Sequence, residues 1–422
     1  MKKNRQKQKK DSVLGTLGAF LGLLIALALL VVVGKQALDR FLPQRRPVQT
    51  EQAAAQTNAA EVPGTEDASP SPANPAPTAE PTPAPTPEPT PEPTPEPTPV
   101  HYTIPEDAHE GPAPIESAYG VISMDEPEKL LEVIQRAREL GLLEEDEAVA
   151  YDPTVSFYRG LHSRDIEYYL DETIMVLLWK EEMDGMCCTF TEIKIADPSQ
   201  FRRKLADDTF DSPNRYPATQ LAEQTKAVVA LNADFYRFRD VGIVAADRQL
   251  YRMKMGTYTG MYKLYNCVET LFVSADGNFF YKRLGEENTE ESIRQFMEEN
   301  DIIFSVAFGP VLIEDGQPLS CSWYPVGEVM QGYSRAGIGQ MGPCHYLYMS
   351  LNHGDQSARW TVDEFARHFA MKPVLTAYCL DGGQTEEVVF RGTPYNYMDF
   401  GEEQLVSDLL YFVTAIPEDA RD

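Results

Sequence analysis

The chain has 422 residues and a formal net charge of −28, because 65 acidic residues outnumber 37 lysines and arginines. This charge argues against nucleic acid as a partner, since phosphate backbones are bound by clustered basic side chains. An anionic ligand would need a local group of arginines. The chain is also long enough to bury a large hydrophobic core.

The first apolar element is residues 13–34, which carry no charged side chain. As a helix rising about 1.5 Å per residue, this stretch spans a hydrocarbon layer of roughly 30 Å, so we predict a transmembrane helix. The basic residues concentrated in residues 1–12 predict a cytoplasmic tail and an extracytoplasmic C-terminal part. A cleaved signal peptide is the alternative, although its apolar core usually has only about 7–15 residues.

Residues 35–105 form the next segment, which is rich in Ala, Thr, Pro and Glu and ends in the repeat PTPAPTPEPTPEPTPEPTP. Alternate prolines favour polyproline II at about 3.1 Å per residue, and the glutamates repel one another. The composition predicts a semi-rigid stalk between the membrane and a folded domain.

The folded part begins with a region at 106–164 whose sequence EPEKLLEVIQRAREL has apolar residues at helical spacing, which predicts a helical appendage. Strands are predicted over 172–180 and 186–195. A short helix is predicted to begin within 198–206, with Asp197 as its cap.

A helix is predicted around 218–226, followed by strands in AVVALNADFY, GIVAADRQLYRM and ETLFVSADGNFFYKRL. Asn288 and Glu291 resemble a capping box that opens another helix. The sequence IIFSVAFGPVLIEDGQPL predicts a hairpin that turns at Asp315-Gly316.

The C-terminal part contains a glycine-rich strand region over 337–351, a helix opened by the capping box of Thr361 to Glu364, and a strand over 373–380. A last helix is predicted from Leu405, Leu409, Phe412 and Val413. Without a regular β-α-β rhythm, these elements predict an α+β domain over 165–416, with a mixed, largely antiparallel sheet and packed helices.

Three stretches place polar side chains beside apolar strands. In LNADFYRFRD, Asn232, Asp234 and Arg239 follow the run AVVAL, where turn formation is the alternative explanation. In YSRAGIGQ, Arg335 precedes glycines that allow close backbone approach, while a surface ion pair is the alternative.

The third stretch is TAYCLDGGQTEE, in which Asp381, Gly382 and Gly383 end an apolar strand. Asp-Gly is a common hairpin turn. The length and apolar character of VLTAYCL instead suggest a central strand whose end holds the Asp381 carboxylate in a cleft. We expect a tight turn that also positions the carboxylate.

No metal or other cofactor is predicted. The six cysteines lack zinc-type spacing and are expected to be small buried residues, with a disulfide pair as the alternative. His345, His353 and His368 also lack ligand spacing and are expected to be structural. The chain has no phosphate loop or dinucleotide fingerprint.

In order and spacing, four stretches resemble the motifs of the phosphodiester glycosidase family, especially those of bacterial secreted relatives. They are ALNADFYRFR, FGPVL, RAGIGQ and CLDGGQTE, within residues 165–395. The resemblance implies hydrolysis of a glycosyl 1-phosphodiester. It implies catalytic roles for Asp381 and Asp234, and substrate binding by Asn232, Arg239, Arg335, Gly382 and Gly383.

Taken with the predicted anchor, the resemblance suggests a single-pass protein of the bacterial cell membrane that acts on cell-envelope polysaccharide. An arginine suits phosphate oxygens, and a carboxylate activates water or stabilises a cationic sugar. The expected partner is an anionic glycan or sugar phosphodiester.

Several positions depart from the family pattern. Cys379 stands where asparagine is usual, Ala233 replaces glycine, Gly337 replaces alanine, GQTE replaces a hydroxyl-rich segment, and Gln220 stands where glutamate is common. A non-catalytic glycan-binding module with an altered pocket is therefore the alternative to an enzyme.

Overall fold

The computed structural model of the protein describes residues 102–421, except 235, 238–240, 255–267, 284–287, 325–330, 353–359 and 398–400. The predicted cytoplasmic tail, the predicted transmembrane helix of 13–34 and nearly all of the predicted stalk lie outside these described residues. Within the described part, every helix falls short of the length and apolar character needed to cross a bilayer.

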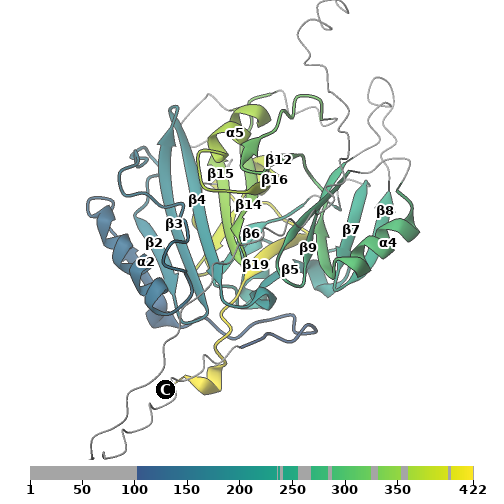
Figure 1. Cartoon of the computed structure of the whole chain (residues 1–422), viewed down its shortest axis with the longest axis horizontal. Helices are drawn as coiled ribbons and strands as arrows, with labels where there is room; N and C mark the ends of the chain where they lie inside the picture. The colour runs from purple at the N-terminus through teal and green to yellow at the C-terminus, as the bar shows by residue number, and fades with distance from the viewer. Residues whose placement is uncertain are drawn as a thin grey trace, which may run out of the picture. The chain divides into compact units, whose positions relative to one another are not determined.

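The largest sheet of the described residues has nine strands, and every pair of neighbouring strands in it is antiparallel (Figure 1). In spatial order its strands are β1 (Tyr119–Ile122), β2 (Ile166–Leu170), β3 (Ile174–Met183), β4 (Met186–Ile195), β15 (His345–Asn352), β14 (Arg335–Gly342), β16 (Thr376–Leu380), β12 (Val311–Glu314) and β13 (Gln317–Pro318).

The described residues also form a five-stranded antiparallel sheet, a three-stranded antiparallel sheet and a two-stranded hairpin (Figure 1). The five strands are β18 (Thr393–Pro394), β17 (Val388–Phe390), β6 (Val229–Asn232), β19 (Asp408–Phe412) and β5 (Phe201–Leu205). The three are β10 (Phe279–Arg283), β9 (Glu269–Ser274) and β11 (Ile302–Val306), and the hairpin pairs β7 (Gly242–Ala246) with β8 (Gln249–Lys254).

Helices cover these sheets on different sides. The α-helices of the described residues are α2 (Leu130–Glu139), α3 (Ala218–Thr225), α4 (Glu290–Glu299) and α5 (Val362–Phe369). Helices α2 and α5 share a core with one face of the nine-stranded sheet, whereas the other face packs against the five-stranded and three-stranded sheets. The predicted α+β class and the mostly antiparallel sheet are confirmed. The predicted domain boundaries stay predictions, although α2 and β1 join this same packed structure.

Two predicted helices are wrong. The helix predicted to begin within 198–206 is a single 3-10 turn, Pro198–Gln200, capped by Asp197 as predicted, after which the chain forms β5 and then a second 3-10 turn that begins at Ala206. The predicted last helix is strand β19, which lies between β6 and β5 with all five residues buried. A continuous apolar run that is buried on both faces fits a central strand and carries no reliable period.

Other predicted details are close to the structure. The helix opened by Thr361 has the predicted capping box, but the box of α4 is formed by Thr289 and Ser292, one residue later than expected. Of the cysteines, Cys187, Cys188, Cys321 and Cys379 are buried, in agreement with the expectation for small apolar residues.

Candidate functional site

Asp381 directly follows strand β16, beside the start of β14. Leu380 pairs with Ala336, so the next residues outward along the two strands are Asp381 and Arg335. The Asp381–Gly382 step does not close the hairpin considered from the sequence, because β16 pairs with β14 and β12 while β17 belongs to another sheet. The structure therefore places this carboxylate at the end of a central strand.

The carboxylate of Asp381 is held in place by its own loop. Its Oδ1 accepts a hydrogen bond from the Gly382 N–H at 3.1 Å, and its Oδ2 accepts one from the Thr385 hydroxyl at 2.6 Å. The residue is 9% exposed. Hydrogen bonds to both carboxylate oxygens fix the orientation of the group. The sequence analysis did not select Thr385, although a hydroxyl four residues after Asp381 is close enough along the chain to bond its carboxylate.

The two glycines allow the loop to approach β14 closely. A Cβ at Gly382 would lie 2.5 Å from the Ser334 carbonyl oxygen, which no side chain tolerates without a shift. Gly383 has φ of +71°, a conformation that favours glycine, and its N–H donates to the same oxygen at 3.2 Å. Both glycines thus bring the backbone of the Asp381 loop close to the start of β14.

Arg335 is 6% exposed and lies at the same strand end. Its Nη2 donates to the Gln331 carbonyl at 2.7 Å, and its guanidinium carbon lies 5.9 Å from the centre of the Tyr333 ring. These contacts orient a cationic group beside the Asp381 loop. A guanidinium in this position suits phosphate oxygens.

Asn232 lies beside Asp381, but its side-chain amide bonds the main chain of Asp381 and not its carboxylate. Its Nδ2 donates to the carbonyl oxygen of Asp381, and its Oδ1 accepts from the Tyr348 hydroxyl at 2.6 Å. Burial raises the pKa of Tyr348, so this hydroxyl remains a donor. The Asp381 N–H donates to the Ala233 carbonyl at 3.2 Å. Asn232 therefore positions the Asp381 segment.

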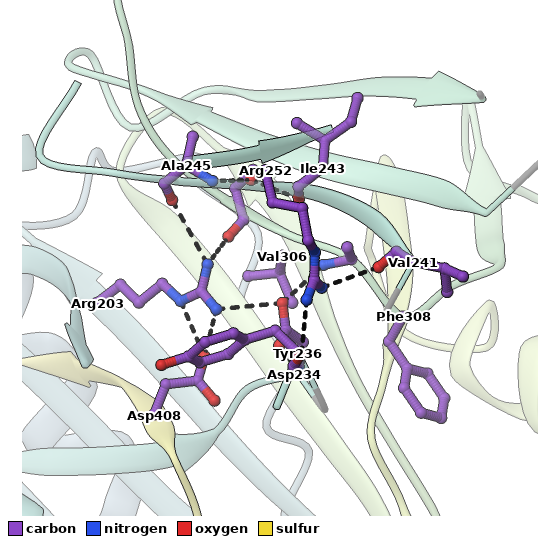
Figure 2. A network of polar contacts seen from close by, with 12 residues as sticks. Arg203, Asp234, Tyr236, Val241, Ile243, Ala245, Arg252, Val306, Phe308 and Asp408 are labelled. Atoms are coloured by element: carbon purple, nitrogen blue, oxygen red, sulfur yellow. Dashed lines mark hydrogen bonds and ion pairs between the residues drawn. The ribbon is translucent and has the colours of Figure 1, made fainter. Parts of the chain in front are cut away.

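Asp234 is placed differently from Asp381. One of its carboxylate oxygens accepts from the Arg203 guanidinium at 3.1 Å and from the Ala307 N–H at 2.9 Å, and the other accepts from the Tyr236 N–H at 2.6 Å. Its side chain is 0% exposed. Figure 2 shows the guanidinium of Arg203 between the carboxylates of Asp234 and Asp408. Asp234 thus belongs to a buried ionic network.

Arg203 and Asp408 complete this network, and the sequence analysis did not select either residue. Arg203 donates to Asp408 Oδ2 through Nε at 2.8 Å and through Nη2 at 2.6 Å, and its Nη1 donates to the Ser305 carbonyl. Burial raises the pKa of Asp408, the guanidinium partly offsets this, and the Asp234 carboxylate adds to the rise. The network joins strands of different sheets.

A second pair of acids lies next to the Asp381 loop. Glu387 is 1% exposed, and burial together with the nearby Glu403 carboxyl raises its pKa to about 9. Its backbone carbonyl accepts from the Asn232 N–H at 3.0 Å. Glu403 accepts from the N–H and hydroxyl of Thr219 in the first turn of α3. Burial and the neighbouring carboxyl therefore favour the protonated form of Glu387.

His345 has the structural role expected of it. Its ring nitrogens lie 2.8 Å from Glu147 and 2.9 Å from Glu192. Burial opposes the charged imidazolium, but these hydrogen bonds outweigh it and raise the pKa of His345. Burial also opposes ionisation of Glu147, yet its bonds to His345 and Lys194 lower its pKa to about 2. This cluster fixes residues 144–151 against the large sheet.

The remaining candidates lie elsewhere. Arg239 is outside the described residues. Gln220 is exposed on α3 and lines a surface hollow with Glu223 and Arg391. Among the residues described, no group of three or more His, Cys, Asp or Glu is arranged to hold a metal ion.

Comparisons with known proteins agree with the motifs. Residues 225–413 match the model of the phosphodiester glycosidase family. The SPbeta prophage-derived uncharacterized protein YomE of Bacillus subtilis (strain 168) is 24% identical over 277 residues, which are 64% of this chain and 40% of that protein. The chain therefore matches less than half of that relative's length.

Two solved structures are also similar. The catalytic domain of zebrafish N-acetylglucosamine-1-phosphodiester alpha-N-acetylglucosaminidase, auto-inhibited by its pro-peptide, has 15% identity and a TM-score of 0.45, with 62% of this chain and 86% of that chain covered. A hypothetical protein from Synechocystis has 14% identity and a TM-score of 0.41, with 59% and 64% covered. The family model carries the assignment: residues 225–413, which are less than half of the chain, match a phosphodiester glycosidase domain.

Proposed function

We propose that the protein hydrolyses a glycosyl 1-phosphodiester of a cell-envelope polysaccharide, releasing a free sugar and a phosphate monoester. The observation that carries the proposal is the Asp381 carboxylate, held by Gly382 and Thr385 beside Arg335 at the end of two neighbouring strands. The match of residues 225–413 to the phosphodiester glycosidase family model supports the reaction type.

In this mechanism the bond between the sugar C1 and the phosphate oxygen breaks, and the phosphate monoester leaves with the electron pair. Water adds to C1, and the Asp381 carboxylate takes its proton. Phosphate is a stable anion, so the demand for a general acid is smaller than in ordinary glycosidases. Arg335 binds the phosphate oxygens and stabilises the charge that develops on them.

Of the two acids predicted to be catalytic, Asp381 suits this role and Asp234 does not. Both Asp234 oxygens already accept hydrogen bonds from buried groups, and Arg203 neutralises its charge. Withdrawing Asp234 from this network would leave Arg203 and Asp408 imperfectly paired. We therefore assign Asp234 a positioning role beneath the site.

The test is a panel of N-acetylhexosamine 1-phosphodiesters incubated with the full-length chain, with free sugar and phosphate monoester measured separately. The corresponding uncharged aryl glycosides serve as matched controls, because they lack the phosphate that Arg335 would bind. Equimolar sugar and monoester from the diesters alone supports the proposal. Saturable glycan binding without product under any condition would instead identify a non-catalytic binding module.

We also propose that residues 13–34 anchor the chain in a bacterial membrane with the N-terminus in the cytoplasm. The uncharged apolar stretch and the basic residues before it support this orientation. Protease added to intact cells should remove the C-terminal domain and leave a tag at residue 1 protected. Protection of both ends would contradict the proposed orientation.

A further inference from the structure

An exposed aromatic ring borders the Asp381 site. Tyr333 is 39% exposed, and the only other aromatic among the large exposed apolar side chains of the described residues is Tyr251. The Tyr251 ring is stacked on Phe210 at 5.3 Å, far along the chain on β8. Tyr333 instead lies two residues before Arg335.

The backbone that carries this ring is fixed to the Asp381 loop. The Tyr333 N–H donates to the Trp360 carbonyl at 3.3 Å, and the adjacent Ser334 carbonyl accepts from the Gly383 N–H at 3.2 Å. A tyrosine held at its main chain loses little further freedom when its ring contacts a ligand, because only two side-chain torsions remain.

The space beside the ring is left open by glycine. A Cβ at Gly383 would lie 3.9 Å from the Tyr333 ring, in ordinary van der Waals contact, so any larger side chain there would cover part of the ring. Gly383 adopts φ of +71°, which independently favours glycine. One edge of the ring therefore borders the backbone of Gly383.

The ring is also adjacent to the proposed phosphate-binding group. The guanidinium carbon of Arg335 lies 5.9 Å from the ring centre. A sugar 1-phosphate has the same two parts side by side, an anion and a ring with an apolar face of C–H groups. Aromatic faces carry partial negative charge and pack well against such C–H groups.

We infer that Tyr333 is the platform on which the sugar ring of the substrate stacks while Arg335 holds its phosphate. This inference rests on the proposed function and deepens it, because it selects pyranosyl phosphodiesters with one unhindered apolar face. Tyr333 is a substrate-binding residue in this account and takes no part in proton transfer.

The test compares Tyr333→Ala, Tyr333→Phe and the matched control Tyr251→Ala in the full-length chain. With an N-acetylhexosamine 1-phosphodiester, Tyr333→Ala should raise KM by about 3- to 10-fold and leave kcat within about twofold, the effect expected of one aromatic stacking contact. Tyr333→Phe keeps the ring and should raise KM less than Tyr333→Ala does, whereas Tyr251→Ala should match the wild type. Competition by inorganic phosphate should be equal in all four proteins.

The alternatives have distinct outcomes. An unchanged KM in Tyr333→Ala, or an equal loss in Tyr333→Phe, overturns the stacking inference while leaving the proposed hydrolysis intact. If the wild type cleaves no diester, calorimetric titration with the same compound separates the two proposals. Binding weakened by Tyr333→Ala alone then refutes hydrolysis and supports the platform, whereas no binding by the wild type refutes both.

Discussion

Replacing Arg203 by methionine should destabilise the protein strongly, because two carboxylates depend on its guanidinium. The side chains of Arg203, Asp234 and Asp408 are all 0–1% exposed, and the distances from Nη2 to the two acids are 3.1 and 2.6 Å. Removing one member of a buried ion pair costs about 3–5 kcal/mol, since the remaining charge stays buried without compensation.

The assay is equilibrium unfolding of the variant in urea. At roughly 3 kcal/mol per molar urea, a loss of 3–5 kcal/mol lowers the unfolding midpoint by about 1 to 2 M. Arg294→Met is the matched control, because Arg294 is exposed and pairs with Glu290 one helical turn away. Such a surface pair contributes about 0–1 kcal/mol.

A second variant isolates the electrostatic cause. Adding Asp408→Leu to Arg203→Met removes one of the two unpaired carboxylates, so the double variant should be more stable than Arg203→Met alone. A loss below about 1 kcal/mol in Arg203→Met would refute the reasoning. The reasoning would also be refuted if the double variant lost as much stability as the sum of the losses in Arg203→Met and Asp408→Leu.

Four other predictions concern the Asp381 loop and three titratable groups. Thr385→Val removes a hydrogen bond to the Asp381 carboxylate and should lower kcat by roughly 10- to 100-fold in steady-state assays, with little change in unfolding midpoint. The pKa of His345 is raised in the folded protein, so its charge stabilises the fold fully below pH 6.5, and this stabilisation is lost as the pH rises through the folded-state pKa. The melting temperature of the wild type should therefore fall over that pH range, whereas that of His345→Gln should not. The pKa of Glu147, lowered to about 2 from 4.5, predicts a second loss as pH falls across that interval. The pKa of Glu387, raised from 4.5 to about 9, makes stability decline with rising pH between those values, and Glu387→Gln should flatten that decline in melting scans.

The sequence alone supported the placement of Asp381. A long apolar run before Asp381 indicated a central strand, and two following glycines indicated close backbone approach; both features are local. The neighbouring position of Arg335 came from the family motifs. The strand pairing that places Arg335 beside Asp381 depends on contacts between distant segments, which no local pattern specifies.

The buried network was missed for a physical reason. Arg203 lies in a stretch predicted as helix, yet strand alternation in FRRKL places Phe201 and Arg203 on one face. Asp408 was hidden because LVSDLLYFV fits a helical face as well as a buried strand. The five residues LLYFV after Asp408 have no polar break and suit either structure, so only the neighbouring strands β6 and β5 identify this segment as a strand.

The most direct test of the account compares Asp381→Asn with Asp234→Asn for turnover of a sugar 1-phosphodiester and for the midpoint of unfolding. The account predicts that Asp381→Asn loses turnover by roughly 10²- to 10⁴-fold, the usual range for a general base, and keeps the wild-type midpoint. Asp234→Asn should instead lower the midpoint of unfolding, because it weakens the buried ionic network. Wild-type turnover in Asp381→Asn, with full stability and no activity in Asp234→Asn, would contradict the assignment of the two carboxylates.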